Sequence, residues 1–359
     1  MERSEVGLIK YYVEWLNLMK IDHLITPYKL GWPVIRASGT PGAFDGMAVD
    51  CAFPFRHNGK FYMTYVGFDG IGYQTALAVS DNLTDWEHKG VILARGGNMA
   101  WDSVGMAGTC LLLEDYGLYG SYKPKKLNGK YWMLYHAYPG EGYETGPAAQ
   151  GLAYTDDEEL LDWKFVGQPI FTRDGGGDWE VSGLYKGFLL EHGGVFYMFY
   201  NAKNPLEPWL EQIGVATSAD LTHWERYPGN PVLPVTPGAW DCVFSSDPCV
   251  WYDGVSGCWA MFYYGFDGRA AMDGVAVSRD LLRWEKFPAP ILTIGGAGAL
   301  DSRYAHKPGI IYHDGALYHF YCACREYRPG DGARNFGDEF RCISVARSAP
   351  WRVPPPEAI

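Results

Sequence analysis

A segment that recurs five times constrains the fold more than any other feature of this chain. Each copy begins with a short turn such as Asn58-Gly59, which closes a β-hairpin. The turn leads into an aromatic strand that ends in Tyr, then into a strand of small residues, and then into a strand carrying Trp. The aromatic strands are residues 61–65, 131–135, 196–200, 259–263 and 318–321. With the strand before the turn, each copy supplies the four strands of one β-propeller blade.

The repeat therefore predicts an all-β fold, a five-bladed β-propeller over residues 31–359. Radial packing lets every blade bury both faces against its neighbours, so no long sheet edge is left exposed. Residues 1–30 are predicted to form a short helical extension outside the propeller. The apolar residues with helical spacing are Ile9, Val13, Leu16 and Met19. This helix either caps one face of the propeller or mediates formation of a homodimer.

Composition narrows the partners and the compartment. The formal net charge of −12 argues against binding to nucleic acid, because contacts with a phosphate backbone need a basic surface. We expect no membrane contact, since no apolar run is long enough to span a bilayer, and no secretory signal at the N-terminus. The eight cysteines lie mostly within apolar strand-like runs, which indicates a reduced, cytoplasmic protein.

Nothing in the sequence requires a cofactor. The spacing of Cys322-x-Cys324 differs from that of structural zinc sites and no matching His or Cys pair accompanies it, so we expect no zinc site there. The sequence also lacks a Gly-rich phosphate loop and a Ser nucleophile elbow. A structural calcium ion at the axis stays open, because carboxylate and carbonyl ligands have no fixed spacing.

The start of each inner strand of a propeller faces the central channel. Aligning the blades on the turn and the aromatic strand places one position from each blade in a common ring. These positions are Asp50, Gly108 or Thr109, Lys186, Asp247 and Lys307, with His306 beside the last. Charged groups in a narrow channel cost desolvation energy unless they are paired or used. We therefore expect the functional site at this ring.

A second acid recurs about six residues before this ring in every blade. The members are Phe44-Asp45, Trp101-Asp102, Trp179-Glu180, Trp240-Asp241 and Leu300-Asp301. Recurrence in all blades favours a structural role, in which the acid caps the loop that enters the blade. Glu180 alone carries the longer side chain, so for this residue a catalytic role and a structural role are equally open.

The axial pattern resembles the five-bladed propeller glycosidases of glycoside hydrolase families 43, 32, 117 and 130. The resemblance covers about residues 30–351. It is carried by the Asp within residues 49–53, the Ser-Asp-Pro of residues 246–248 and the His-Lys-Pro of residues 306–308. Family 117, which uses an Asp-Pro in blade four and a His in blade five, is closest. Family 43 differs, because its second Asp and its Glu would fall on Gly108-Thr109 and Lys186.

The resemblance implies roles for the axial residues. Asp50 would be the base or nucleophile, Asp247 would tune pKa values and position the sugar, and His306 would donate the proton. Glu180 is the competing proton donor. Glycoside hydrolysis needs such a pair, since one group protonates the leaving oxygen while another activates water or attacks the anomeric carbon. The alternatives are a strand-starting hydrogen bond for Asp247 and a core position for His306.

Other residues are candidates for binding the sugar. Trp101 and Trp240 lie in loops predicted to reach the rim of the funnel, where an indole ring can stack on a sugar; packing inside the blade explains them equally well. The remaining candidates are Thr109, Lys186, Lys307 and Arg303. The two lysines have a structural alternative, namely ion pairs with the axial acids.

We therefore predict an exo-acting glycoside hydrolase that removes a terminal sugar from an oligosaccharide. The expected sugar is of arabinofuranoside, galactoside or anhydro-galactoside type. One alternative is a phosphate-dependent glycoside phosphorylase, in which cations such as Lys186, Lys307 and Arg303 would bind the phosphate. The other is a non-catalytic carbohydrate-binding propeller, since a fold alone does not fix a function.

Overall fold

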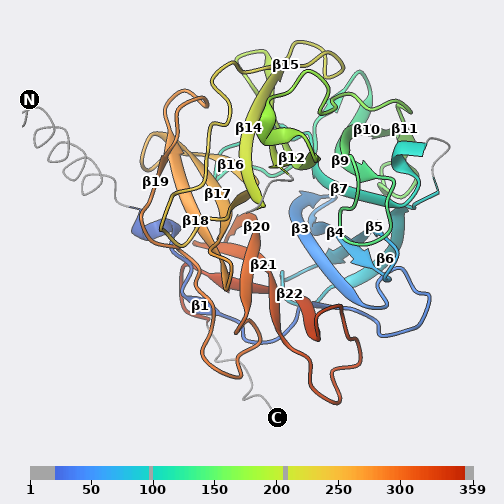
Figure 1. Cartoon of the computed structure of the whole chain (residues 1–359), viewed down its shortest axis with the longest axis vertical. Coiled ribbons are helices and arrows are strands. Elements are labelled where there is room, and N and C mark those ends of the chain that lie inside the picture. Colours follow the sequence, from blue (N-terminus) through green and yellow to red (C-terminus); the bar gives the residue numbers. More distant parts are fainter. Residues whose placement is uncertain (1–20, 97–99, 205–208, 352–359) are drawn as a thin grey trace, which may run out of the picture.

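The computed structural model describes residues 21–96, 100–204 and 209–351 and shows β-sheets arranged around a central axis (Figure 1). Within these ranges, three short 3-10 helices accompany the strands: η1 (Asp22–Leu24), η2 (Ala100–Asp102) and η3 (Asp178–Glu180). The predicted all-β propeller is confirmed. The helix expected within residues 5–20 lies outside the described residues, so its role in a homodimer stays a prediction.

Each blade is an antiparallel sheet whose first strand lies nearest the axis. Blade one contains β3 (Ala48–His57), β4 (Lys60–Phe68), β5 (Tyr73–Ser80) and β6 (Glu87–Leu93). Blade two contains β7 (Gly105–Leu111), β8 (Lys126–Leu127), β9 (Lys130–Tyr138), β10 (Ala149–Thr155) and β11 (Lys164–Phe165). Blade three contains β12 (Gly183–His192), β13 (Val195–Asn204), β14 (Leu210–Ser218) and β15 (Glu225–Arg226). Blade four contains β16 (Phe244–Asp253), β17 (Cys258–Phe266), β18 (Ala271–Ser278) and β19 (Glu285–Lys286).

Blade five joins the two ends of the propeller. Its strands β20 (Tyr304–His313), β21 (Ala316–Glu326) and β22 (Glu339–Arg347) are completed by β1 (Tyr28–Lys29) and β2 (Ile35–Arg36), which both pair with β22. Residues 28–29, predicted to belong to the N-terminal extension, therefore lie on the outer edge of blade five. The ring is closed by main-chain hydrogen bonds between distant parts of the sequence, which leaves no open sheet edge at the junction.

The repeated sequence explains how the strands of a blade pack. Trp240 stacks on Tyr263 with ring centroids 5.7 Å apart, and the indole lies against Gly274. A Cβ at Gly274 would come within 2.5 Å of the indole, so the adjacent strand needs a residue without a side chain there. The same arrangement occurs in two other blades, at Trp101–Tyr135–Gly151 and Trp179–Tyr200–Gly214. The aromatic strand and the small-residue strand are thus matched parts of the blade interior.

An irregularity interrupts each inner strand near the axis. In four blades its first residue has a positive φ: Cys51 (52°), Lys186 (28°), Asp247 (54°) and Lys307 (68°). Such bulges bend the strand and redirect side chains. Asp50 pairs with Val66 just before the bulge, as His306 pairs with Cys322. Asp50 is therefore equivalent to His306 and not to Lys307, so the predicted alignment was wrong by one residue in blade one.

Among the described residues, no helix combines the length and the apolar composition that are needed to cross a bilayer.

Candidate functional site at the propeller axis

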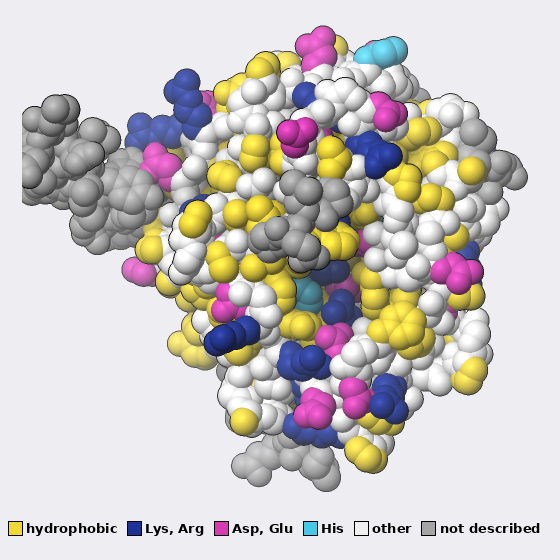
Figure 2. Space-filling view, in the orientation of Figure 1, with side chains coloured by type: hydrophobic (Ala, Val, Ile, Leu, Met, Phe, Trp, Pro, Cys, Tyr) yellow, Lys and Arg dark blue, Asp and Glu magenta, His cyan; other side chains and the backbone are white. Residues whose placement is uncertain are grey.

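Basic, acidic and His side chains gather in a hollow at the centre of the face shown in Figure 2. A cavity of about 260 Å³ lies here, lined by residues of blades one, two, four and five. The lining residues are Tyr73, Tyr143, Glu144, Phe244, Tyr264, Phe266, Ala271, Tyr304, His306, Lys307 and Arg341. Aromatic rings and charged groups share this wall, which suits a polar ligand that also has an apolar face, as a sugar has.

Asp50, on β3, is fully engaged by its neighbours. Its side chain is only 1% exposed, and its Oδ2 accepts hydrogen bonds from Lys307 Nζ at 2.8 Å and Arg341 Nη1 at 3.0 Å. The backbone N–H of Cys51 donates to Oδ1. Burial alone would raise the pKa of Asp50, but the cations Lys307 and Arg341 hold this pKa well below its ordinary value. Asp50 is a saturated carboxylate that joins blade one to blade five.

Two further carboxylates share one lysine. Lys203 Nζ, from β13, lies 2.6 Å from Glu144 Oε2 and 3.4 Å from Glu211 Oε1. Glu144 comes from the loop between β9 and β10, whereas Glu211 lies on β14. Glu144 lines the cavity and 15% of its side chain is exposed, so it is far more accessible than Asp50. The structure thus brings two carboxylates together at a position that the sequence did not reveal.

His136, on β9, holds the other side of Glu144. The backbone N–H of Lys186 donates to His136 Nδ1 at 3.2 Å, so the ring proton lies on Nε2. His136 Nε2 lies 3.6 Å from Glu144 Oε1. Burial would raise the pKa of Glu144, but Lys203 and His136 hold this pKa well below its ordinary value. Glu144 is therefore an ionised carboxylate at the cavity wall.

Asp247 is buried at the bulge of β16. Its Oδ1 lies 3.0 Å from Ser246 Oγ, and among the described residues its Oδ2 has no hydrogen-bond partner. Burial raises the pKa of Asp247 to about 6, against the opposing effect of Lys307 and Lys186. Ser246 Oγ also lies 3.0 Å from Glu211 Oε2. Because a hydroxyl has one proton, a proton on Asp247 lets these three groups form a continuous hydrogen-bonded series.

His306 lines the cavity beside Lys307. Its Nδ1 donates to the backbone carbonyl of Cys322 at 3.1 Å, because a carbonyl oxygen can only accept. Burial, assisted by Arg341 and Lys307, lowers the pKa of His306 to about 3. A neutral imidazole of this tautomer offers a lone pair at Nε2 rather than a proton. This geometry disfavours the predicted role of His306 as proton donor.

The other predicted ring residues occupy the axial bulges. Lys307 lines the cavity and pairs with Asp50, which was the structural alternative for this lysine. Lys186 is buried at the bulge of β12. Thr109 is buried too, and its Oγ1 donates to the backbone carbonyl of Leu134 at 3.1 Å. Of the three, Lys307 is the one placed to contact a ligand in the cavity.

Glu180 lies near the outer edge of blade three rather than at the axis. Its Oε1 accepts a hydrogen bond from Nε of Arg226, at 2.9 Å, on the outermost strand β15 (Figure 1). The equivalent acids of blades four and five form matching pairs, Asp241–Lys286 and Asp301–Lys29. These ion pairs agree with the structural role predicted for this series. The structure does not bring Glu180 together with the axial acids.

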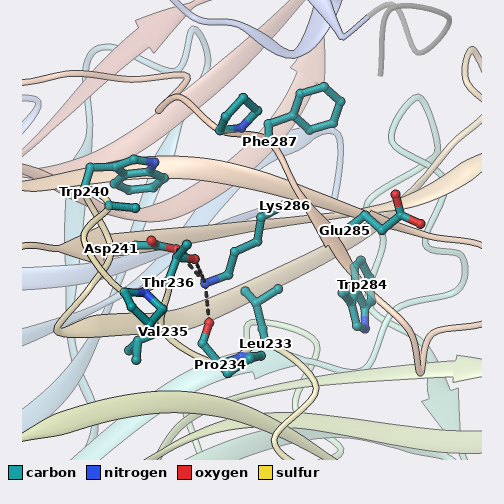
Figure 3. A pocket seen from close by; sticks show the side chains of 13 residues that line it. Leu233, Pro234, Val235, Thr236, Trp240, Asp241, Trp284, Glu285, Lys286 and Phe287 are labelled. Carbon is teal, nitrogen blue, oxygen red and sulfur yellow. Dashed lines mark hydrogen bonds and ion pairs between the residues drawn. The ribbon is translucent and has the colours of Figure 1, made fainter. Parts of the chain in front are cut away.

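The two predicted sugar-binding tryptophans lie inside their blades. Trp101 stacks on Tyr135 with ring centroids 5.7 Å apart. Trp240 lines a different cavity of about 400 Å³, which lies between residues 233–241 and residues 284–288 (Figure 3). There Lys286 extends toward Asp241 and forms an ion pair of 2.6 Å with it. Both indoles also stack on a tyrosine of their own blade, as the packing alternative expects.

Arg303, the last predicted binding residue, lies beside the axial cavity. Its Nη1 donates to the backbone carbonyl of Gly337 at 3.3 Å, and its guanidinium lies 5.8 Å from the centre of the Tyr304 ring. Tyr304 belongs to the cavity wall, whereas Arg303 stands behind it. Arg303 is thus placed to support an aromatic wall residue rather than to line the cavity.

Three side chains near the axis share one position in the repeat, and two of them, Glu211 and Arg341, were missed by the sequence-based interpretation. Tyr73, Glu211 and Arg341 each pair with the residue three positions after the repeated Tyr of the neighbouring strand. Tyr73 Oη and Arg341 Nη1 both contact Asp50 Oδ2. Aligning the third strands of the blades could have found this set. Glu144 had no such signal, because it lies in a loop outside the repeat.

The charges at the axis do not fit the calcium ion that the sequence left open. Calcium takes six to eight oxygen ligands, mostly from free carboxylates, carbonyls and water. Here Asp50 is bonded to Lys307 and Arg341, and Glu144 is bonded to Lys203. Protein cations already occupy the places where a metal cation would bind these two acids.

Comparisons with known proteins identify the family. The chain is 31% identical to the protein in a solved structure named as a complex of BT0996 with RGII, over 94% of this chain and 97% of that one, with a TM-score of 0.77. A second solved structure, named "Glycoside hydrolase", is also 31% identical, over 93% and 96% of the two chains, with a TM-score of 0.77. The protein belongs to the five-bladed propeller glycoside hydrolases. The family described as "Glycosyl hydrolases family 32 N-terminal domain" matches residues 122–293 of this family member.

More distant similarities agree on the fold. Solved family 43 and family 117 glycoside hydrolases are 20% and 16% identical to this propeller glycoside hydrolase, with TM-scores of 0.60 and 0.62, and show the fold alone. The family 117 enzyme is from Zobellia galactanivorans. A "1,2-beta-oligomannan phosphorylase" of Thermoanaerobacter sp. (strain X514) is 36% identical over 131 residues, which are 33% of this chain and 37% of the relative. The chain thus matches little more than a third of that relative's length.

Proposed function

We propose that the axial cavity hydrolyses the glycosidic bond of a terminal sugar in an oligosaccharide. The observation that carries this proposal is a pair of carboxylates: Glu144 lines the cavity, and Lys203 links it to Glu211. Glycoside hydrolysis uses two carboxyl groups on either side of the bond to be broken. A cavity of about 260 Å³ suits one sugar ring at the end of an oligosaccharide, which supports exo action.

Glu144 is the carboxylate that attacks the anomeric carbon. It faces the cavity and is held ionised by Lys203 and His136. Attack forms an ester with the sugar and breaks the bond to the leaving oxygen, which takes a proton from Glu211; water then cleaves the ester. Glu144 Oε2 and Glu211 Oε1 lie 2.6 and 3.4 Å from the same atom, Lys203 Nζ. These two oxygens are therefore closer together than the roughly 6.5–9.5 Å that separates the carboxyl groups of inverting enzymes. This spacing supports a retaining mechanism.

Asp247 supplies the proton that Glu211 delivers. The two acids lie on either side of Ser246 Oγ, which is 3.0 Å from an oxygen of each. A proton that leaves Asp247 can therefore reach Glu211 as Ser246 accepts one hydrogen bond and donates the other. Asp247 thus keeps the role of tuning the acid that the family resemblance implied for it.

Asp50 has a positioning role in this proposal rather than that of the nucleophile. Its Oδ2 accepts hydrogen bonds from Lys307 and Arg341, two residues of the cavity wall, and is itself almost fully buried. By fixing these two cations, Asp50 sets the shape and charge of the wall against which the sugar lies. His306 also lines this wall.

The substrate class follows from the relatives and is tested by a panel. One relative is named as a complex with RGII, which supports an RGII fragment or a similar oligosaccharide as substrate. The panel contains RGII fragments, arabinofuranosides, galactosides and anhydro-galactose-terminated fragments. Proton NMR of the first product identifies the sugar released and its anomeric configuration. A released sugar of inverted configuration contradicts the assignment of Glu144 as nucleophile.

Phosphorolysis is the second candidate, favoured by the 36% identity to an oligomannan phosphorylase over part of the chain. Lys307 and Arg341 at the cavity wall would be the phosphate-binding cations. Both already contact Asp50, which leaves less positive charge for an anion. The same panel with and without inorganic phosphate separates the two reactions. Turnover that requires phosphate and yields a sugar phosphate would replace hydrolysis by phosphorolysis.

A further inference from the structure

Three side chains of types that can bind a metal, one His and two Cys, lie together in blade five beside the axial cavity. β21 places Cys322 and Cys324 two residues apart, on one face of the strand, and β20 places His306 directly opposite Cys322. The two Sγ atoms and one ring nitrogen of His306 all lie within 4.8 Å of one another, and all three residues are buried. None of these side chains acts as nucleophile or acid in the reaction proposed above.

The spacing of the two sulfurs agrees with a tetrahedral zinc ion. Sγ of Cys322 lies 3.7 Å from Sγ of Cys324. Two thiolates bound to zinc at about 2.3 Å and at a tetrahedral angle lie about 3.8 Å apart. Sulfur and imidazole nitrogen are the ligands that zinc prefers, whereas harder cations prefer oxygen. The arrangement therefore needs little movement to bind zinc.

His306 is held in the form that a metal requires. Its Nδ1 donates to the backbone carbonyl of Cys322, which fixes the ring and leaves the lone pair on Nε2. Zinc-binding histidines commonly donate their second ring N–H to a carbonyl or carboxylate in this way.

The charges around the group are balanced. Arg341, a cation close to the group in the fold, lies opposite Cys324 in the strand register. This guanidinium is bonded to Asp50 at 3.0 Å and Glu339 at 3.1 Å, which compensates its charge. Two thiolates would in turn neutralise the charge of a zinc ion. A metal here therefore adds no net charge to a buried region.

We propose that His306, Cys322 and Cys324 bind one zinc ion. Three protein ligands leave the fourth coordination position to water or to a sugar hydroxyl, since His306 is also part of the cavity wall. The Cys-x-Cys spacing gave no sign of this site, because its third ligand comes from the neighbouring strand. The site is independent of the assignment of the nucleophile and is tested without an activity assay.

The test is the zinc content of the purified full chain, prepared with reductant and without chelator, then loaded with zinc and dialysed. Elemental analysis is expected to give about one zinc ion per protein molecule. The variants Cys322→Ser and Cys324→Ser should lose affinity for zinc by more than the roughly 10–100-fold typical of removing a supporting residue. Cys258→Ser, which changes a buried cysteine of blade four, is the matched control and should keep wild-type zinc content.

Cobalt gives a readout on the unaltered protein, so the test does not depend on whether the variants fold. Co²⁺ bound by two thiolates is expected to show thiolate-to-metal charge-transfer absorption and tetrahedral d–d bands. Less than about a tenth of a zinc ion per folded protein after loading overturns the proposal. So does unchanged zinc content in the double variant Cys322→Ser/Cys324→Ser, because the metal would then lie elsewhere. A Cys322–Cys324 disulfide in the freshly isolated protein, detected by mass spectrometry, also overturns it.

Discussion

Two carboxylates at the same axis have opposite surroundings. Asp50 has a side chain that is 1% exposed and an Oδ2 that contacts Lys307, Arg341 and Tyr73. Glu144 is 15% exposed, lines the cavity and is paired on one side with Lys203. Both have a pKa held below its ordinary value, so charge alone does not separate them. Accessibility does, because a nucleophile must reach the substrate and a saturated, buried carboxylate cannot.

The two clusters also connect different parts of the ring. Asp50 joins β3 of blade one to the cations of blade five, where the chain closes the propeller. Glu144 connects a loop of blade two to β13 and, through Lys203, to Glu211 on β14. Removing the first carboxylate should therefore affect folding, and removing the second should affect chemistry. The predictions below test this division from the largest effect to the smallest.

Glu144→Gln should reduce kcat by about 10⁴-fold, because the amide cannot attack the anomeric carbon. The amide keeps the size of the side chain, so we expect an unchanged circular dichroism spectrum and midpoint of urea unfolding. Steady-state kinetics on the substrate found by the panel measure the effect. Glu158→Gln is the matched control, since Glu158 pairs with an exposed lysine at the surface. Activity of Glu144→Gln within tenfold of wild type would remove Glu144 from the nucleophile role.

Asp50→Asn should lower the free energy of unfolding by about 3–5 kcal/mol, because it leaves Lys307 and Arg341 as buried cations with one fewer anion. Urea unfolding monitored by Trp fluorescence measures this change. Asp81→Asn, which breaks an exposed pair with Lys60, is the control and should cost less than about 1 kcal/mol. A fully stable Asp50→Asn protein would contradict this division, because the ion pairs of Asp50 would then add nothing to the stability of the fold.

Asp247 should make stability depend on pH. Burial raises its pKa to about 6 in the folded protein, against the effect of Lys307 and Lys186 and with that of Glu144 and Asp50. The folded protein thus binds a proton that the unfolded protein loses near pH 4, so this stabilisation is present at low pH and is lost as pH rises through about 6. The loss amounts to about 3 kcal/mol.

The variant Asp247→Asn isolates this effect, because the amide does not titrate. Urea unfolding of both proteins between about pH 4 and 7 should show the wild type losing stability relative to the variant as pH rises. In the activity assay, kcat of the wild type should fall as pH rises and Asp247 deprotonates. The pH profile of the variant should lack this decrease. Parallel stability curves across this range would mean that Asp247 has an ordinary pKa.

The sequence predicted the architecture because each blade repeats the same short pattern of turn and strands. The turn, the aromatic strand and the small-residue strand recur, and Gly274 shows why the pattern is strict, since a Cβ there would meet Trp240 at 2.5 Å. The sequence also identified Asp247, His306 and Lys307 as axial residues. It assigned the roles less well, because a role depends on which groups lie nearby in other blades.

The remainder of the site depends on contacts that no local pattern encodes. Glu144 lies in a loop, and its partner Lys203 follows the aromatic strand of a different blade. Asp50 lies one residue before the bulge of β3, whereas Asp247 and Lys307 lie within the bulges of their own strands. Cys322 and Cys324 meet His306 only through the register of β20 and β21. Each of these features needs the strand pairing before it can be seen.

The acids at the outer edges of the blades should contribute least to activity, and Glu180 tests this. Glu180 Oε1 accepts hydrogen bonds from Arg226 Nε and from the backbone N–H of Gly177. Neither partner belongs to the axial cluster. Glu180→Gln keeps an acceptor at this position and replaces charge-assisted bonds by neutral ones, so it should cost about 1 kcal/mol of stability. We expect kcat and KM to equal those of the wild type, measured beside Glu144→Gln on one substrate. A loss of kcat at constant stability would show that an acid outside the axial cavity takes part in the reaction.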